Sequence, residues 1–251
     1  MRTYATLVRR ELGGHFISWT GYVVLAAVLF LLGFCFVNLL QALNTEPSEQ
    51  PILELFYSNY LFFWLILLLA APIITMRTFA LEKFTGTFET LMTTPVSDFE
   101  VVMAKFTGAM IFYMLIWLAL LALVFIVRHF GNDPTVLDWG TLGSTYLGIF
   151  LLGMLFMSLG CFASSLTRSL VVAAMVTFAL GISIFILGFL AFSAAGQPGW
   201  QARLLLQISL IEHMRDFARG VVDTRALVFY LSLTGVFLFL THKVVESRRW
   251  T

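Results

Sequence analysis

The chain has 251 residues, of which 60% are hydrophobic and only 12% are charged. Soluble globular domains carry roughly 45–50% apolar and about 25% charged residues, so this composition excludes an ordinary soluble domain and indicates a membrane protein. The formal net charge of +1 argues against a nucleic-acid partner, because there is no excess of Lys and Arg to neutralise phosphates.

Residues 1–18 form the first predicted element, a helix lying in the plane of the membrane surface. Four apolar residues recur at helical spacing and three arginines fall on the other side: Tyr4, Leu7, Val8 and Leu12, and Arg2, Arg9 and Arg10. This pattern is typical of an interfacial helix whose basic face meets anionic lipid. Glu11 breaks the pattern by falling close to the apolar face. The alternative is an ordinary positive flank of the first span.

Six stretches are apolar enough to cross a bilayer, which takes about 20 residues in a helix. The predicted spans are Trp19–Leu43, Phe56–Met76, Phe106–Val127, Thr141–Ala163, Leu170–Ser193 and Ala226–Val245. The fold class is therefore an all-α integral membrane protein, with residues 1–251 as one transmembrane domain. Pro72 lies near the end of the second span, where it is a possible kink and hinge.

The polar segment Arg77–Lys105 predicts two short helices followed by a new, capped one. Gly86 and Thr87 favour a break with a restart at Phe88, because Gly is a poor helix former and Thr a good N-cap. Pro95 stops the restarted helix. Ser97 and Glu100 then have the spacing of a capping box in front of the third span.

Apolar and charged side chains are interleaved in this segment, as in loops that dock into a groove of a partner. We expect Phe84, Phe88 and Leu91 to form one apolar stripe. Glu82, Lys83 and Glu89 flank it. The alternative is a packed turn that only connects two spans.

Span five carries a stripe of small residues, Ala173, Thr177 and Gly181 with Gly188 two turns on. Such a stripe lets another helix approach closely, either within the chain or across a subunit interface.

The segment before the last span predicts an amphipathic helix over 204–222, either lying on the membrane or capping a cavity between spans. Its charged residues include two pairs at helical spacing, Glu212 with Arg215 and Arg219 with Asp223.

The distribution of Lys and Arg predicts the orientation. With the N-terminus inside, ten basic residues collect on the cytoplasmic side: Arg2, Arg9, Arg10, Arg77, Lys83, Lys105, Arg168, Lys243, Arg248 and Arg249. Both termini are therefore predicted to be cytoplasmic, which places the Arg77–Lys105 loop inside and the 204–222 helix outside.

The sequence lacks the residues for chemistry of its own. It has no Gly-Lys dipeptide, which rules out the phosphate-binding loop G-x-x-x-x-G-K-[ST]. The histidines (His15, His129, His213 and His242) are scattered, so solvated or capping roles are expected for them, not metal ligation. Apart from Lys243 at the cytoplasmic end of the last span, no charged residue falls inside a predicted span, which weakens ion-driven transport. Cys35 and Cys161 are predicted to be apolar packing residues.

The stretch from Pro72 to Ser97 resembles the signature of bacterial ABC transporter permeases of the type-2 exporter family. The shared features are Met76-Arg77, Glu82, Gly86-Thr87-Phe88-Glu89-Thr90-Leu91 and Pro95-Val96-Ser97, followed by Lys105. The likeness is greatest to gliding-motility-associated and nitrous-oxide-maturation permeases. Two other stretches are similar to parts of that family. The N-terminal start of the family resembles Arg9-Arg10-Glu11-Leu12, and its segment before the last span resembles Phe217-Ala218-Arg219-Gly220. Phe84 and Thr85 depart from it, since small polar or basic residues are expected there.

The resemblance implies a permease half of an ATP-driven exporter in the bacterial inner membrane, non-enzymatic itself. ATP and Mg would be bound by a separate cytoplasmic ABC ATPase. A second permease half, identical or related, would complete the path, with a periplasmic accessory protein as a further possible partner. The implied ATPase-coupling residues are Arg77, Glu82, Lys83, Gly86, Thr87, Phe88, Glu89, Leu91 and Pro95, and the implied outer gate is Glu212, Arg215, Arg219 and Asp223.

Two other functions stay open at this stage. One is an ion channel or ion-coupled carrier. The other is an anchoring or assembly subunit of a motility or secretion complex. Neither would need the loop to bind an ATPase.

Overall fold

The computed structural model describes residues 2–45, 56, 61–92, 96–130, 139–194 and 207–247. Six helical stretches of the described residues are long and apolar enough to cross a membrane. They correspond to α2 (Trp19–Thr45), α4 (Leu61–Thr75), α7 (Asp98–Phe130), α8 (Trp139–Leu166), α9 (Leu170–Ala194) and α12 (Thr224–Ser247). The second stretch, Phe63–Thr85, continues from α4 through a turn into the short helix α5 (Ala80–Thr85). The prediction of an all-helical fold with six spans is confirmed, and the described residues contain no strand.

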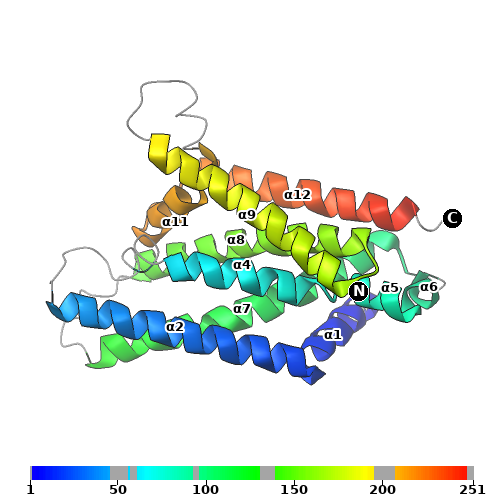
Figure 1. Cartoon of the computed structure of the whole chain (residues 1–251), viewed down its shortest axis with the longest axis horizontal. Coiled ribbons are helices and arrows are strands. Elements are labelled where there is room, and N and C mark those ends of the chain that lie inside the picture. The colour runs from blue at the N-terminus through cyan, green and yellow to red at the C-terminus, as the bar shows by residue number, and fades with distance from the viewer. Residues whose placement is uncertain are drawn as a thin grey trace.

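Four further helices lie at the two ends of this bundle (Figure 1). They are α1 (Arg2–Ile17), α5 (Ala80–Thr85), α6 (Thr87–Met92) and α11 (Leu210–Ala218). The helices α1, α5 and α6 lie at one end, where α1 begins and α12 finishes, and α11 lies toward the other. Both ends of the described chain thus lie on one side, as predicted, while the compartment on that side remains a prediction.

Helix α8 is the centre of the bundle and the most deeply buried span. It contacts α4, α7, α9, α11 and α12. Small residues make this possible, because a Cβ added at Gly148, Gly153 or Gly160 would collide with Phe217, Tyr113 or Thr75 respectively. Without a hydrophobic driving force in lipid, such close approach supplies the van der Waals contact that holds spans together.

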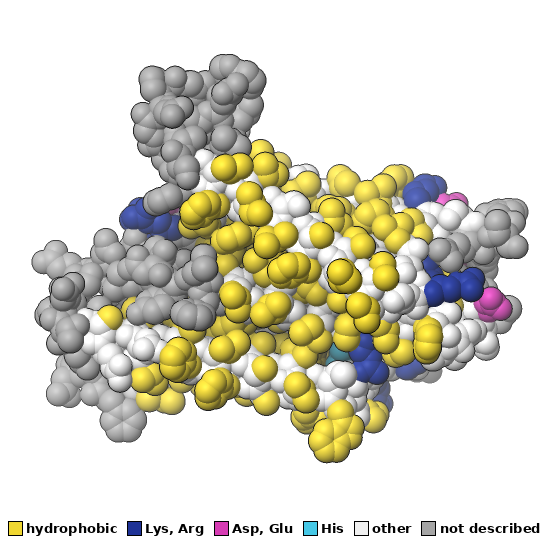
Figure 2. All heavy atoms as spheres, in the orientation of Figure 1, with side chains coloured by type: hydrophobic (Ala, Val, Ile, Leu, Met, Phe, Trp, Pro, Cys, Tyr) yellow, Lys and Arg dark blue, Asp and Glu magenta, His cyan; other side chains and the backbone are white. Residues whose placement is uncertain are grey.

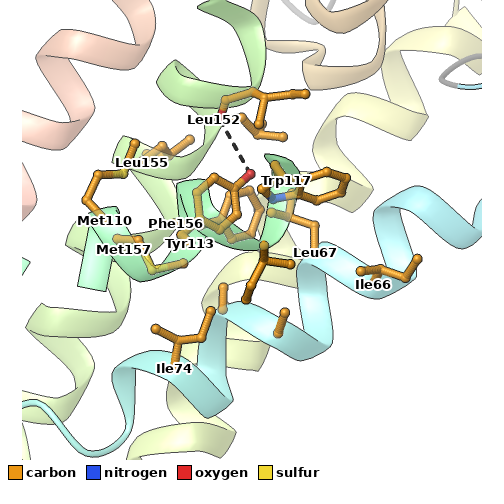
Figure 3. Close-up of a cluster of buried hydrophobic side chains, with 14 of the residues drawn as sticks. Ile66, Leu67, Ile74, Met110, Tyr113, Trp117, Leu152, Leu155, Phe156 and Met157 are labelled. Atoms are coloured by element: carbon orange, nitrogen blue, oxygen red, sulfur yellow. Dashed lines mark hydrogen bonds between the residues drawn. The ribbon is translucent and has the colours of Figure 1, made fainter. Parts of the chain in front are cut away.

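Large side chains of α4, α7 and α8 fill the space around Tyr113 and Trp117 (Figure 3). The Tyr113 hydroxyl donates a hydrogen bond to the Ile149 carbonyl at 3.4 Å, which satisfies a buried polar group where no water is at hand. The outer surface of the bundle is also apolar along its middle. Figure 2 shows mainly hydrophobic side chains, in yellow, over the middle of the molecule, and the charged side chains lie toward its ends. Cys35 and Cys161 are buried and free, as predicted.

Helix α7 begins at Asp98, eight residues before the apolar run at Phe106, as the predicted capping box requires. The predicted end of the helix before the last span is wrong. The helix predicted over 204–222 is described only as Leu210–Ala218. Ser209 caps its start, and Gly220, at a φ of 86°, ends it. Residues 204–206 lie outside the described part of the chain.

Candidate functional site

The segment between α4 and α7 folds into a hairpin of the two short helices α5 and α6, which we call the α5–α6 hairpin (residues 80–92). The start of α5 is held by α8, because the Ser164 hydroxyl accepts hydrogen bonds from the backbone N–H groups of Phe79 and Ala80 at 3.1 and 3.0 Å. Gly86 ends α5 in the left-handed region, with a φ of 75°. The predicted break at Gly86 and Thr87 is thus confirmed.

The predicted capping box is also present at the start of α7. The Ser97 hydroxyl accepts from the Glu100 N–H at 3.3 Å, and the Glu100 carboxylate accepts from the Ser97 N–H at 3.3 Å. These reciprocal bonds satisfy two backbone donors that a helix start leaves unpaired. The hairpin therefore leads into a helix that runs from Asp98 through the membrane region without interruption.

Four charged residues join the hairpin to α1 and α7, and we call them the ion cluster: Arg10, Glu11, Glu82 and Lys105. The Lys105 Nζ lies 3.0 Å from Glu11 Oε1 and 2.9 Å from Glu82 Oε2. Arg10 lies 3.0 Å from Glu11 and 2.8 Å from Glu82. Each carboxylate thus meets both cations, so three elements far apart in the sequence share one network.

Lys105 is the most deeply buried member, with a side chain only 2% exposed. An ammonium taken out of water is costly unless it is paired and hydrogen-bonded. Here the pairing is complete, because Nζ also donates to the Thr78 carbonyl at 2.6 Å and lies 5.3 Å from the centre of the Phe79 ring. In the sequence, Lys105 is one of the predicted cytoplasmic cations and follows the family-like signature, and neither feature predicts that it is buried.

The structure shows why Glu11 breaks the amphipathic pattern of α1. The apolar face of α1 packs against α7, and Glu11 on that face forms an ion pair with Lys105 of α7. Gly108 allows the approach, since a Cβ there would come within 2.8 Å of Glu11. Burial raises the pKa of Glu11, but the charges and hydrogen bonds of Lys105 and Arg10 outweigh it and hold that pKa below its ordinary value. A lone acid on an apolar helix face was the signal that a buried partner exists.

The α5–α6 hairpin has an inner and an outer face. On the inner face, Lys83 donates to the Ser165 carbonyl and lies 5.2 Å above the ring of Phe88, which is itself buried. On the outer face, Phe84 is 73% exposed, and Thr87 and Glu89 are exposed as well. The expected stripe of Phe84 and Phe88 is therefore wrong, because the left-handed turn at Gly86 points the two rings apart.

The remaining predicted coupling residues fall in other places. Arg77 lies in the turn between α4 and α5 and donates to the hydroxyls of Ser18 and Thr20, at the junction of α1 and α2. The Leu91 side chain and Pro95 lie outside what the structure describes. The possible hinge residue, Pro72, is buried inside α4, three residues before the helix ends.

His15 and His213 are buried, so the solvated role expected for them is wrong. The His15 ring stacks on Phe112, with centroids 5.0 Å apart. Burial lowers its pKa below the ordinary value, and the charges of Arg77 and Lys105 act in the same direction against that of Glu11. Burial likewise lowers the pKa of His213, whose ring meets Tyr230 at 5.7 Å. Within the described ranges, no three His, Cys, Asp or Glu residues are grouped as metal ligands.

The small-residue stripe of span five faces the inside of the chain. Ala173, Thr177, Gly181 and Gly188 are all buried. A Cβ at Gly181 would lie 3.0 Å from Phe156 of α8, and one at Gly188 would lie 3.2 Å from Leu210 of α11. Of the two possibilities left open by the sequence, the structure shows the internal contact.

The predicted outer-gate residues surround α11. Glu212 belongs to its first turn, where its N–H donates to Ser209 at 3.4 Å, and Arg215 to its last turn. Both are half-buried, whereas Arg219, which caps the helix, is exposed. Asp223 accepts a hydrogen bond from the Arg225 N–H at 2.9 Å, at the start of α12. Asp216, which the sequence analysis did not single out, lies among them, and burial together with the charge of Glu212 raises its pKa.

This arrangement of six spans with a structured hairpin between the second and third agrees with a comparison against known families. A family model described as ABC-2 family transporter protein matches residues 19–247. The chain belongs to this family. It is accordingly the multi-pass permease component of an ABC transporter, and the family implies an ABC ATPase subunit as its partner. No curated protein matches the permease.

Proposed function

We propose that this ABC-2 permease forms half of the translocation path of an ATP-driven exporter, and that the α5–α6 hairpin receives the motion of a separate ATPase. The observation that carries this proposal is the division of the hairpin into two faces. Phe84, Thr87 and Glu89 are exposed on its outer face, where the Phe84 ring is 73% exposed. An apolar ring beside a carboxylate is suited to docking in a groove of a partner.

The inner face of the hairpin connects it to the helices that would carry its motion into the membrane. Glu82 of α5 binds Lys105 of α7 and Arg10 of α1, while Ser164 of α8 holds the first turn of α5. A displacement of the hairpin is therefore passed to α1 and α7 together. Because α7 is continuous from Asp98, it carries that motion along the third span. Two-state movement of this kind is what alternating access requires.

The remaining parts of the proposal follow from charge and resemblance. The excess of Lys and Arg at the α5–α6 end supports a cytoplasmic location for that end in a bacterial inner membrane. ATP and Mg are then bound by the ATPase, and a second permease half, identical or related, completes the path. A periplasmic accessory protein would meet the α11 end. The likeness of the Pro72–Ser97 stretch to gliding-motility and nitrous-oxide-maturation permeases supports the direction of export.

The test separates the two faces of the hairpin. Phe84→Asp and Glu89→Lys change only outer residues, so we expect the permease to stay folded while it loses copurification with its ATPase and stimulation of ATP hydrolysis. Glu82→Lys should do the reverse, because it breaks the ion cluster: the ATPase still binds, but its hydrolysis is no longer stimulated.

The matched control is Glu246→Lys, which makes the same charge reversal at an exposed position near the end of α12, at the same end of the bundle. It should leave copurification and hydrolysis as in the wild type. Full stimulation of the ATPase by both outer-face variants would refute the docking assignment. Copurification lost equally in Glu246→Lys would show that charge at this end, not the hairpin, binds the partner.

A further inference from the structure

A polar cavity of about 180 Å³ lies between α1, the α5–α6 hairpin and α7. Three cations and two carboxylates line it: Arg10, Arg77 and Lys105, and Glu11 and Glu82. His15, which also lines it, is neutral at pH 7 because burial lowers its pKa. The cavity therefore carries one more positive than negative charge, which suits a singly charged anion.

The surplus charge is located on Arg77. Lys105 and Arg10 are both paired with the two carboxylates of the ion cluster. Arg77, in contrast, donates only to the hydroxyls of Ser18 and Thr20, both times from Nη1. Among the described residues no carboxylate pairs with it. A guanidinium has five N–H donors in a fork that matches phosphate oxygens, so most of its binding capacity is unused.

The cavity adjoins a largely apolar groove of about 660 Å³. The two share Gly14, Arg77 and Leu81, so Arg77 stands where the polar part meets the apolar part. Ile17 and Trp19 line the groove and are 86% and 85% exposed. A Trp at the end of a span is typical of the headgroup level of a bilayer. A site that is charged at one end, apolar at the other and located at this level has the chemistry of a phospholipid.

We propose that Arg77 binds the phosphate of an anionic phospholipid, whose headgroup enters the cavity between α1 and the α5–α6 hairpin while an acyl chain follows the groove past Trp19. This site does not depend on the proposed ATPase docking, since it uses the inner side of the hairpin. It gives α1 a lipid ligand at one defined position, in addition to general attraction between its arginines and the membrane surface.

Two variants test the site by different means. Arg77→Gln removes the phosphate ligand. Gly14→Leu fills the point where cavity and groove meet without removing a charge, and there is open space at its Cβ, which would have no neighbour within 4 Å. Their matched controls are Arg9→Gln, an exposed arginine of the same helix, and Gly13→Leu, whose Cβ would meet only Ile17 at 3.9 Å. Neither Arg9 nor Gly13 lines the cavity or the groove.

The measurement is lipid retention by native mass spectrometry of the purified full chain titrated with phosphatidylglycerol in a neutral detergent, together with the rise in Tm. We expect one retained lipid and a raised Tm for the wild type, Arg9→Gln and Gly13→Leu. Arg77→Gln and Gly14→Leu should bind about tenfold more weakly or worse, since a charge-assisted contact or the space itself is lost.

Three results would overturn the proposal. Equal loss in Arg9→Gln and Arg77→Gln would show general surface electrostatics. Equal retention by Gly14→Leu and Gly13→Leu would show that the cavity is not the site. Inorganic phosphate or glycerol phosphate raising the Tm as much as phosphatidylglycerol would identify a site for a small free anion. An ATPase that still binds Arg77→Gln and is still stimulated by it would leave the proposed function intact whichever of these occurs.

Discussion

Replacing Lys105 by Met removes the cation at the centre of the ion cluster while it keeps the length of the side chain. Taking one partner from a buried ion pair costs about 3–5 kcal/mol, because the other charge is left uncompensated. The value here should lie near the lower limit. The carboxylates of Glu11 and Glu82 are 14% and 17% exposed, and Arg10 still contacts both. We therefore expect a loss of about 3 kcal/mol in the free energy of unfolding.

The assay is thermal unfolding of the purified permease in mild detergent, followed by tryptophan fluorescence. For a chain of this size 1 kcal/mol corresponds to roughly 2–4 °C, so Lys105→Met should lower the Tm by about 6–12 °C. The control is Lys243→Met. Lys243 makes a slightly shorter ion pair than Lys105, 2.7 Å from Glu246, but the two side chains are 53% and 40% exposed. Its Tm should stay close to that of the wild type.

A second substitution shows whether the loss comes from the ion pair itself. In Lys105→Met with Glu82→Gln, one of the stranded carboxylates is gone, so the double variant should lose less than the sum of the two single changes. A Tm for Lys105→Met equal to that of Lys243→Met would refute the reasoning. So would strict additivity of the two single variants, because the residues would then not interact.

Three further predictions concern single positions. Gly86→Ala should speed hydrogen exchange of the α5–α6 hairpin about 5- to 30-fold, since the φ of 75° costs a residue with a Cβ about 1–2 kcal/mol; unchanged exchange would contradict this. Gly181→Leu should overpack the helix contact, which costs about 1–3 kcal/mol of stability and lowers the Tm, whereas Ser183→Leu, exposed on the same helix, should leave the Tm unchanged. His15→Phe should flatten the pH dependence of the Tm below about pH 6.5. The lowered pKa keeps folded His15 neutral while the unfolded chain takes up a proton, so stability falls as the pH drops; an equal slope in the variant would exclude His15 as its source.

The sequence by itself determined the six spans. Charged side chains and unpaired backbone groups are costly in lipid, so a span must be a helix of about 20 mostly apolar residues, and such a stretch is recognised from composition alone. It also determined the break at Gly86 and the capping box of Ser97 and Glu100. These depend on backbone preferences and hydrogen bonds between residues no more than three apart, so neighbours in sequence are sufficient to predict them.

Only the tertiary structure decided which charges meet. Glu11 and Lys105 are 94 residues apart, and nothing local distinguishes a buried lysine from one in an ordinary basic flank. The same limit applies to the hairpin, where the turn at Gly86 sends Phe88 inward and leaves Phe84 outside. Hydrophobicity is a property of each residue by itself. Burial of a charge is different, because its free-energy cost is offset only when a partner from another element neutralises the charge. Which partner lies nearby is decided by packing in three dimensions.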